Sequence, residues 1–269
     1  MLKSRTLTAL VLSLGTLWIL LATPAWAYTG FIFLVLFMGA WEWGRLAGLI
    51  RLPLRVAYAL LLTAALAAAH WLLPVSPMWW AVLALLWWLL VLVRIPSFRA
   101  GTPQQHLDLP SLLAGLPTLL PFAVLALSIY EWHRLWVLLC LLVVAASDMG
   151  AYFAGRAFGH SKLVPNVSPG KTWAGLWGGL LASGLVGTLG ALTYAPGQLE
   201  VIAPGFVLGV GTGFLATIGD LNESMLKRRS GAKDSGSLLP GHGGVLDRID
   251  SLSAAVSFFT LGLMVMAWV

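Results

Sequence analysis

The stretch MWWAVLALLWWLLVLVR, residues 78–94, is apolar throughout except for its final arginine. A helix crosses the bilayer core, about 30 Å thick, with about 20 such residues, so this stretch predicts a transmembrane helix. The whole chain of 269 residues has the same character, being 59% hydrophobic and only 10% charged. A soluble domain carries roughly a quarter charged residues, and disordered or low-complexity chains are more polar still. The composition therefore excludes those classes and indicates an integral membrane protein.

Eight further apolar runs lie between charged or Pro/Gly-rich breaks. Together the nine runs predict an all-α, polytopic integral membrane protein with about nine transmembrane helices. Two pairs of runs are weakly separated, so eight or ten spans stay open. In chain order the runs cover residues 7–24, 28–46, 54–73, 78–94, 111–130, 134–154, 172–194, 203–219 and 251–269.

The basic residues predict the orientation in the membrane, because Lys and Arg concentrate in short cytoplasmic loops. With the N-terminus inside, 15 of the 16 Lys and Arg residues lie on the cytoplasmic side and only Arg134 faces out. The C-terminus then lies outside. The first run has an alternative reading as a cleaved signal, since it follows Lys3 and Arg5 and ends in the small-x-small pattern Ala25-Trp26-Ala27.

The composition changes at about residue 140. Residues 1–140 form N-terminal transmembrane runs rich in Leu, Ala and Trp, whereas Gly, Ser, Thr and charged residues enter the runs within 141–269. Small residues every four positions predict close helix packing, although the same faces leave a homodimer open. The single cysteine, Cys140, excludes an intrachain disulfide and is expected to be a buried hydrophobe. The small residues are Gly175, Gly179, Ser183 and Gly187, followed by Gly205, Gly209 and Gly213.

Half of the ten acidic residues fall between residues 220 and 250, a stretch predicted to be a cytoplasmic loop. Two carboxylates such as Asp220 and Asp247 suit a hard divalent cation such as Mg²⁺, with room for a second cation. Lys and Arg nearby suit a polyphosphate, and glycines around His242 let backbone N–H groups approach a ligand. A solvated loop that only enforces orientation is the alternative, and it is favoured for Arg229 alone. The charged residues are Asp220, Glu223, Lys227, Arg228, Arg229, Lys233, Asp234, Asp247, Arg248 and Asp250.

A second polar cluster occupies residues 147–156 and 168–173. Its Gly170-Lys171-Thr172 triplet is not a phosphate-binding P-loop, because that motif requires a glycine where the chain has Pro165. Asp148 lies near the end of an apolar run, where an unpaired carboxylate is unfavourable. It is either a functional residue or one half of a structural ion pair with Arg156 or Lys171. The formal net charge of +6 is explained by Lys and Arg residues that set the orientation in the membrane or bind phosphate groups. No nucleic-acid partner is therefore expected.

Residues 224–250, SMLKRRSGAKDSGSLLPGHGGVLDRID, resemble the signature of the phosphatidate cytidylyltransferases, also called CDP-diacylglycerol synthases. Every fixed position of that signature is filled. The stretches 148–156, 168–172 and 219–221 also look like this family, so the similarity in motifs covers about residues 147–250, and the N-terminal runs match in hydropathy only. Ala174 departs from the pattern, since a polar residue is expected there.

The resemblance implies transfer of the cytidylyl group of CTP to phosphatidic acid, giving CDP-diacylglycerol and pyrophosphate in phospholipid biosynthesis. The partners would be CTP, phosphatidic acid and the membrane lipid. The rival enzyme is a CTP-dependent kinase or a cytidylyltransferase acting on another membrane lipid. A transporter is the alternative from another class, but it predicts charges spread along a path near the midplane. The resemblance also implies the bacterial inner membrane, with the active site facing the cytoplasm, where CTP is found.

The implied site residues fall into three groups. Asp220 and Asp247 would bind Mg²⁺. The other implied catalytic residues are Lys227, Arg228, Lys233 and Arg248 as phosphate ligands, with Asp234, His242 and Asp250 orienting them. The implied substrate-binding residues are Asp148, Ser168, Lys171, Ser224, Gly243 and Gly244.

Overall fold

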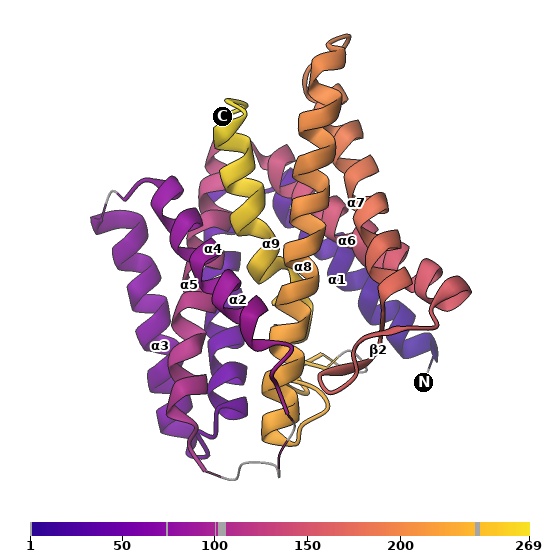
Figure 1. Ribbon diagram of the computed structural model, residues 1–269. Coiled ribbons are helices and arrows are strands. Elements are labelled where there is room, and N and C mark those ends of the chain that lie inside the picture. The colour runs from indigo at the N-terminus through magenta and orange to yellow at the C-terminus, as the bar shows by residue number, and fades with distance from the viewer. Residues whose placement is uncertain (1, 74, 100, 102–105, 240–242) are drawn as a thin grey trace.

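The computed structural model describes residues 2–73, 75–99, 101, 106–239 and 243–269 as a bundle of helices with one short β-hairpin (Figure 1). A π-helical turn, η1 (Ala68–Leu72), extends the third helix, and a 3₁₀ turn, η2 (Leu199–Val201), precedes the eighth. The α-helices of the described residues are α1 (Leu2–Ala22), α2 (Ala25–Leu46), α3 (Leu52–Ala67), α4 (Pro77–Arg94), α5 (Leu109–Trp132), α6 (Arg134–Phe158), α7 (Trp173–Tyr194), α8 (Ile202–Ser230) and α9 (Leu246–Val265).

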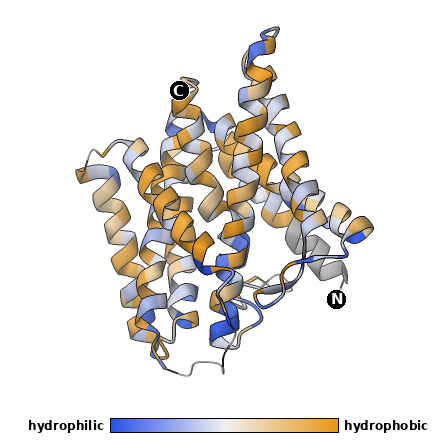
Figure 2. Ribbon diagram, viewed as in Figure 1, coloured by the Kyte–Doolittle hydropathy of each residue, from blue (hydrophilic) through white to orange (hydrophobic). Residues whose placement is uncertain are grey.

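Eight helical segments of the described chain are long and apolar enough to cross a membrane. They are α2, α3 with its π turn, α4 to α7, α8 with its 3₁₀ turn, and α9, whereas α1 contributes the shorter apolar segment Leu10–Ala22. The prediction of an all-α, polytopic integral membrane protein is confirmed. Figure 2 shows that many hydrophilic residues gather at one end of the bundle, around the C-terminal end of α8 and the hairpin.

The segment predicted as a loop over 220–250 is helical at both ends, which corrects that expectation. Helix α8 continues to Ser230 over 29 residues, and α9 begins at Leu246. An ion pair between Glu223 and Lys227, one turn apart, supports this extension of α8. Gly231, in the left-handed conformation with φ 68°, ends the helix. Polar residues can continue a membrane helix past its apolar run. A hydropathy boundary therefore marks the end of the apolar segment and not the end of the helix.

The antiparallel hairpin of β1 (Lys162–Val164) and β2 (Ser168–Thr172) was not predicted. Strand β2 runs directly into α7, and the Thr172 hydroxyl accepts a hydrogen bond of 3.1 Å from the Gly175 N–H as the helix cap. The Gly170-Lys171-Thr172 triplet is thus a strand end, in agreement with the exclusion of a P-loop.

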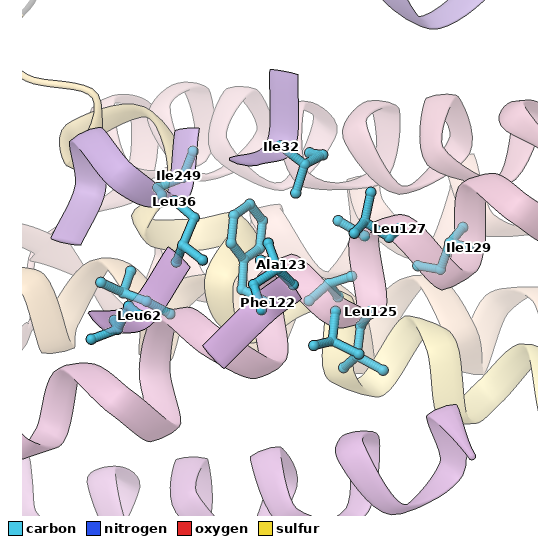
Figure 3. Packing of buried hydrophobic residues seen from close by; sticks show 14 of the residues in the cluster. Ile32, Leu36, Leu62, Phe122, Ala123, Leu125, Leu127, Ile129 and Ile249 are labelled. Atoms are coloured by element: carbon cyan, nitrogen blue, oxygen red, sulfur yellow. The ribbon is translucent and has the colours of Figure 1, made fainter. Parts of the chain in front are cut away.

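A shared apolar core joins the N-terminal helices to α9 (Figure 3). Leu36 from α2, Leu62 from α3 and Phe122 from α5 are buried in it together with Ile249 from α9. Asp250 directly follows Ile249, so the packing of α9 against the N-terminal helices sets the position of its polar residues. The region 1–140 therefore supports the polar region from within the same bundle.

The small residues of α6, α7 and α8 lie where these helices approach each other most closely. A methyl group on Gly178 would overlap the Ala154 side chain on α6, and one on Gly187 would overlap the Gly205 carbonyl of α8. The prediction of close helix packing is confirmed. Because these faces are buried within the chain, they do not support a homodimer, which stays a prediction.

Candidate active site

A cavity of about 380 Å³ lies between α6, the hairpin, α7 and α8, and we call it the carboxylate cavity. Asp148 from α6, Lys171 from β2 and Asp220 from α8 line it together with Arg156 and Thr217. These side chains come from segments that are up to 72 residues apart in the sequence, Asp148 to Asp220. The structure thus brings together three of the sequence-predicted site residues, Asp148, Lys171 and Asp220.

Lys171 and Asp220 form an ion pair in this cavity. The Lys171 Nζ lies 2.8 Å from one carboxylate oxygen of Asp220, and the Ser224 hydroxyl donates to the other over 3.3 Å. Asp148 is not held by the ion pair expected as its structural alternative. Lys171 pairs with Asp220 instead, and Arg156 donates to the Tyr152 hydroxyl at 3.1 Å. Within the described chain no ion pair is formed by Asp148, which leaves its carboxylate facing the cavity.

A second ion cluster continues from the cavity along α8 and α9. Lys227 bridges two carboxylates, with its Nζ 2.7 Å from Glu223 and 2.8 Å from Asp247. Asp250 interacts electrostatically with both Glu223 and Asp220, so it connects this cluster to the carboxylate cavity. The helices can cross this closely because α8 has Gly219 at the crossing point, where a methyl group would overlap the Asp250 carbonyl.

The joined clusters have an excess of negative charge. Five carboxylates, Asp148, Asp220, Glu223, Asp247 and Asp250, stand against the three cations Arg156, Lys171 and Lys227, so two negative charges are left when all are ionised. Glu223 is 1% exposed, and one of its carboxylate oxygens has no hydrogen-bond partner in the described structure. Buried, uncompensated charge is costly, so this region suits bound cations.

The donor set fits Mg²⁺ held partly by a phosphate ligand. Among the described residues no three carboxylate, His or Cys side chains converge on one point as a complete protein cage. Mg²⁺ does not need such a cage, since it is usually bound by one or two carboxylates, substrate phosphates and water. Asp220 and Asp148 present carboxylates to the cavity, whereas both oxygens of Asp247 are already engaged by protein donors.

Asp247 anchors the connection between α8 and α9, residues 231–245. One of its oxygens accepts hydrogen bonds from the Ser235 N–H at 2.9 Å, the Ser235 hydroxyl at 2.7 Å and the Gly244 N–H at 2.8 Å. Its other oxygen takes the Lys227 ammonium. Asp247 therefore joins the connection to the ion cluster on α8.

Comparison with known proteins places this chain in a family. The model of the cytidylyltransferase family matches residues 3–266. The chain belongs to the cytidylyltransferase family. Its relatives include the phosphatidate cytidylyltransferase of Pseudomonas aeruginosa, 41% identical over 100% of this chain and 99% of the relative. That of Haemophilus influenzae is 38% identical over 97% of this chain and 98% of the relative. The resemblance found in residues 147–250 is confirmed and extends over the N-terminal helices.

Two α2 residues that the sequence motifs did not reveal hold the connection between α8 and α9 in place. Buried Glu42 accepts hydrogen bonds from the backbone N–H groups of Val245 at 3.1 Å and Leu246 at 2.8 Å, and it shares the single Ser235 hydroxyl proton with Asp247, at 2.9 Å from the hydroxyl oxygen. Arg45 donates to the carbonyl oxygens of Asp234 and Ser235. The available signal was an acidic residue inside the apolar run 28–46, where ionisable groups mark function or pairing.

The remaining predicted site residues lie outside the carboxylate cavity. Among the described residues, Lys233, Asp234 and Arg248 are exposed, while Ser168 lies on β2 and does not line the cavity. Arg228 donates to the Val167 carbonyl over 3.3 Å and so links α8 to the hairpin. Gly243 pairs with Leu239 in an isolated bridge, and Gly244 binds Asp247 as described above. His242 lies outside the described residues.

Proposed function

We propose that this membrane protein is a phosphatidate cytidylyltransferase that makes CDP-diacylglycerol from CTP and phosphatidic acid. A phosphate oxygen of phosphatidic acid attacks the α-phosphorus of CTP and forms a new P–O–P bond. The bond from the α-phosphorus to the oxygen that bridges to the β-phosphorus breaks, and pyrophosphate leaves. The observation that carries the proposal is the joined ion cluster in a chain of this family, since two named phosphatidate cytidylyltransferases match it along nearly their full length.

The side chains of the carboxylate cavity suit the electrostatic demands of this reaction. Two anions, the lipid phosphate and the CTP triphosphate, must meet, so the main task is to neutralise and position them. The Lys171 ammonium, already at the cavity, can exchange its contact with Asp220 for a phosphate oxygen. Asp148 and Asp220 would then be the carboxylates available to hold a cation. No general base is needed, because the lipid phosphate is already ionised near neutral pH.

We propose Mg²⁺ as the cofactor, with Asp220 as its main protein ligand and Asp148 as a second one. When bound, Mg²⁺ would neutralise the phosphates and favour loss of pyrophosphate. Asp247, predicted from the sequence as the second ligand, is proposed here to hold Lys227 and the 231–245 connection, because its oxygens already accept four hydrogen bonds. The excess negative charge leaves room for a second cation.

We also propose that the cavity faces the cytoplasm from the inner membrane of a bacterium. The positive-inside distribution of Lys and Arg supports this orientation. CTP is a cytosolic substrate, and the lipid phosphate lies at the membrane interface, so both reach this end of the bundle.

The test is conversion of radiolabelled CTP by the full chain in detergent. Lipid-soluble label should appear only with both phosphatidic acid and Mg²⁺, and EDTA should abolish it. Asp220→Asn should lower turnover at least about 100-fold, because it removes the charged carboxylate proposed as the main protein ligand of Mg²⁺. Glu200→Gln, a change of the same kind at an exposed position, serves as the matched control and should keep full turnover.

Two results would overturn the proposal. If folded protein leaves all label in CTP, the activity is wrong. If label enters another lipid acceptor in preference to phosphatidic acid, or appears as a phosphorylated lipid, the rival lipid cytidylyltransferase or kinase is correct. Normal turnover in Asp220→Asn would remove the metal assignment while leaving the reaction itself in place.

A further inference from the structure

A second cavity, of about 230 Å³, lies between α2, α4, α5 and α8, near the ends of α4 and α8. We call it the arginine pocket. Its walls combine cationic and aromatic side chains, and the six that matter here are Trp43, Trp87, Arg94, Phe98, Arg99 and Arg229.

The arginine pocket and the ion cluster lie on different faces of α8. Asp220 and Lys227 form one face, whereas Asn222 and Arg229 line the arginine pocket. The two sets are offset by two residues, which is a rotation of about 200° around an α-helix. Helix α8 therefore separates the two cavities, and the arginine pocket is distinct from the proposed active site.

The arginine pocket has a net positive charge. Arg229 lies 3.3 Å from Asp108 and 5.7 Å from the centre of the Phe98 ring, so one of the three cations is compensated. Arg99 donates only to backbone carbonyls, and Arg94 has no side-chain partner among the residues that the structure describes. The sequence between Arg99 and Asp108 contains no acidic residue. Two positive charges are thus left for a ligand.

The aromatic walls of the pocket are held in fixed positions. The Trp43 indole N–H donates to the Ser111 carbonyl at 2.8 Å, and the Trp87 indole N–H donates to the Thr118 hydroxyl at 3.0 Å. Indoles of this kind concentrate at the membrane interface, where lipid headgroups lie. The hollow is therefore shaped before any ligand binds, with apolar walls beneath a cationic opening.

Helix α4 has one side on the pocket and another on the outer surface of the bundle. Trp87 and Arg94 line the pocket, while Leu86, Leu90 and Val93 of the same helix are 55%, 60% and 69% exposed on the outside of the bundle. Arg94 is the last residue of α4 and Arg229 the penultimate residue of α8, so the cations lie at helix ends where headgroup phosphates are found.

We propose that the arginine pocket binds the phosphate headgroup of an anionic phospholipid, with the acyl chains along the exposed side of α4. Guanidinium groups bind phosphate oxygens through paired, charge-assisted hydrogen bonds, and this explains three arginines around one hollow. Basic residues that serve only to orient a membrane protein need no preformed cavity. The inference does not depend on the proposed reaction, because it concerns a lipid that is bound and not consumed.

The experiment is native mass spectrometry of the full chain in detergent, titrated with dioleoylphosphatidylglycerol. This lipid is anionic and is not the acceptor of the proposed reaction, so its binding and the enzyme activity can fail independently. Wild type is compared with R94Q/R99Q, in which Arg229 is kept because it also pairs with Asp108. The charge-matched control is R5Q/R51Q, which removes two basic residues elsewhere. Dioleoylphosphatidylcholine and a large molar excess of inorganic phosphate are the ligand controls.

Wild type and R5Q/R51Q should retain phosphatidylglycerol. R94Q/R99Q should bind it at least about tenfold more weakly, because it loses the charge-assisted hydrogen bonds from two arginines to the phosphate. Phosphatidylcholine should bind weakly to all three proteins. Equal retention by R94Q/R99Q and wild type, with matching elution volumes and melting curves, would overturn the proposal. Displacement of the lipid by inorganic phosphate would overturn it as well, because the ligand would then be a free anion.

Discussion

Replacement of Glu42 by alanine tests whether the N-terminal half positions the active site. Glu42 is 4% exposed and does not line the carboxylate cavity, but it accepts from the Val245 and Leu246 N–H groups and from the Ser235 hydroxyl. Alanine would leave the N–H groups of Val245 and Leu246, at the start of α9, without an acceptor. It would also remove the contact that holds Ser235, and with it the 231–245 connection, against α2. Asp247, which binds Ser235, would lose its orientation along with Lys227.

The magnitude follows from the hydrogen bonds lost. Each backbone N–H left unpaired in a buried place costs about 1–3 kcal/mol, so the two N–H groups at Val245 and Leu246 cost about 2–6 kcal/mol. Val245 is only half-buried, so water can reach it and the lower part of this range applies. About 2–3 kcal/mol corresponds to a change of about 30- to 150-fold in the equilibrium between the 231–245 connection held against α2 and the same connection released. We expect kcat for CDP-diacylglycerol formation to fall by a similar factor, with a smaller change in KM for CTP.

The assay is steady-state turnover of radiolabelled CTP by folded, detergent-purified variants. Glu42→Gln keeps the shape and one acceptor oxygen, so it should recover part of the lost kcat. Glu131→Ala is the control, since the Glu131 side chain is 60% exposed and its nearest basic partner, the His70 imidazole, is 3.8 Å away. It should change kcat less than about twofold. Wild-type kcat in a folded Glu42→Ala protein would refute the reasoning, as would equal loss in the alanine and glutamine variants.

Three other results are expected. Lys227→Met should sharply lower the melting temperature in detergent, because it leaves Glu223 and Asp247 buried without their cation, at a cost of about 3–5 kcal/mol. Adding Glu223→Gln should restore part of the lost melting temperature, and no restoration would count against the ion pair. Gly209→Leu should destabilise the α7–α8 packing and lower the melting temperature, because a side chain there would overlap the Ser183 carbonyl; an unchanged melting curve would argue against this close approach. Removal of divalent cations should stop turnover without unfolding the protein, and added Mg²⁺ should restore it; turnover that persists under chelation would contradict the cofactor proposal.

Much of the fold could be predicted because lipid leaves the backbone few choices. A run such as 78–94 must satisfy its backbone hydrogen bonds internally, so its hydropathy predicts a helix, and α4 confirms it. The α8–α9 region shows where this reasoning fails. Hydropathy ends near residue 219, but Glu223 and Lys227 continue the helix through their ion pair, so polar composition alone was misread as a loop.

The site could be predicted only in part. Its chemical type was readable from the carboxylates and basic residues between 220 and 250, since charge is costly beside a membrane and is kept where it has a partner or a ligand. Which charges meet was not readable. Asp247 was expected to bind metal beside Asp220, but in the structure it takes Lys227 and the Ser235 backbone, while Asp148 faces the cavity with Asp220.

The sequence by itself determined the membrane class, the helical architecture and the family signature, because each depends on local composition or on a contiguous motif. The tertiary structure alone decided that Lys171 faces Asp220, that Glu42 caps α9, and that three arginines surround one hollow. Glu42 and Leu246 are 204 positions apart, and no local pattern encodes such a contact. It results from how α2 and α9 pack around their shared apolar core, where side-chain shape and burial select one arrangement of the helices.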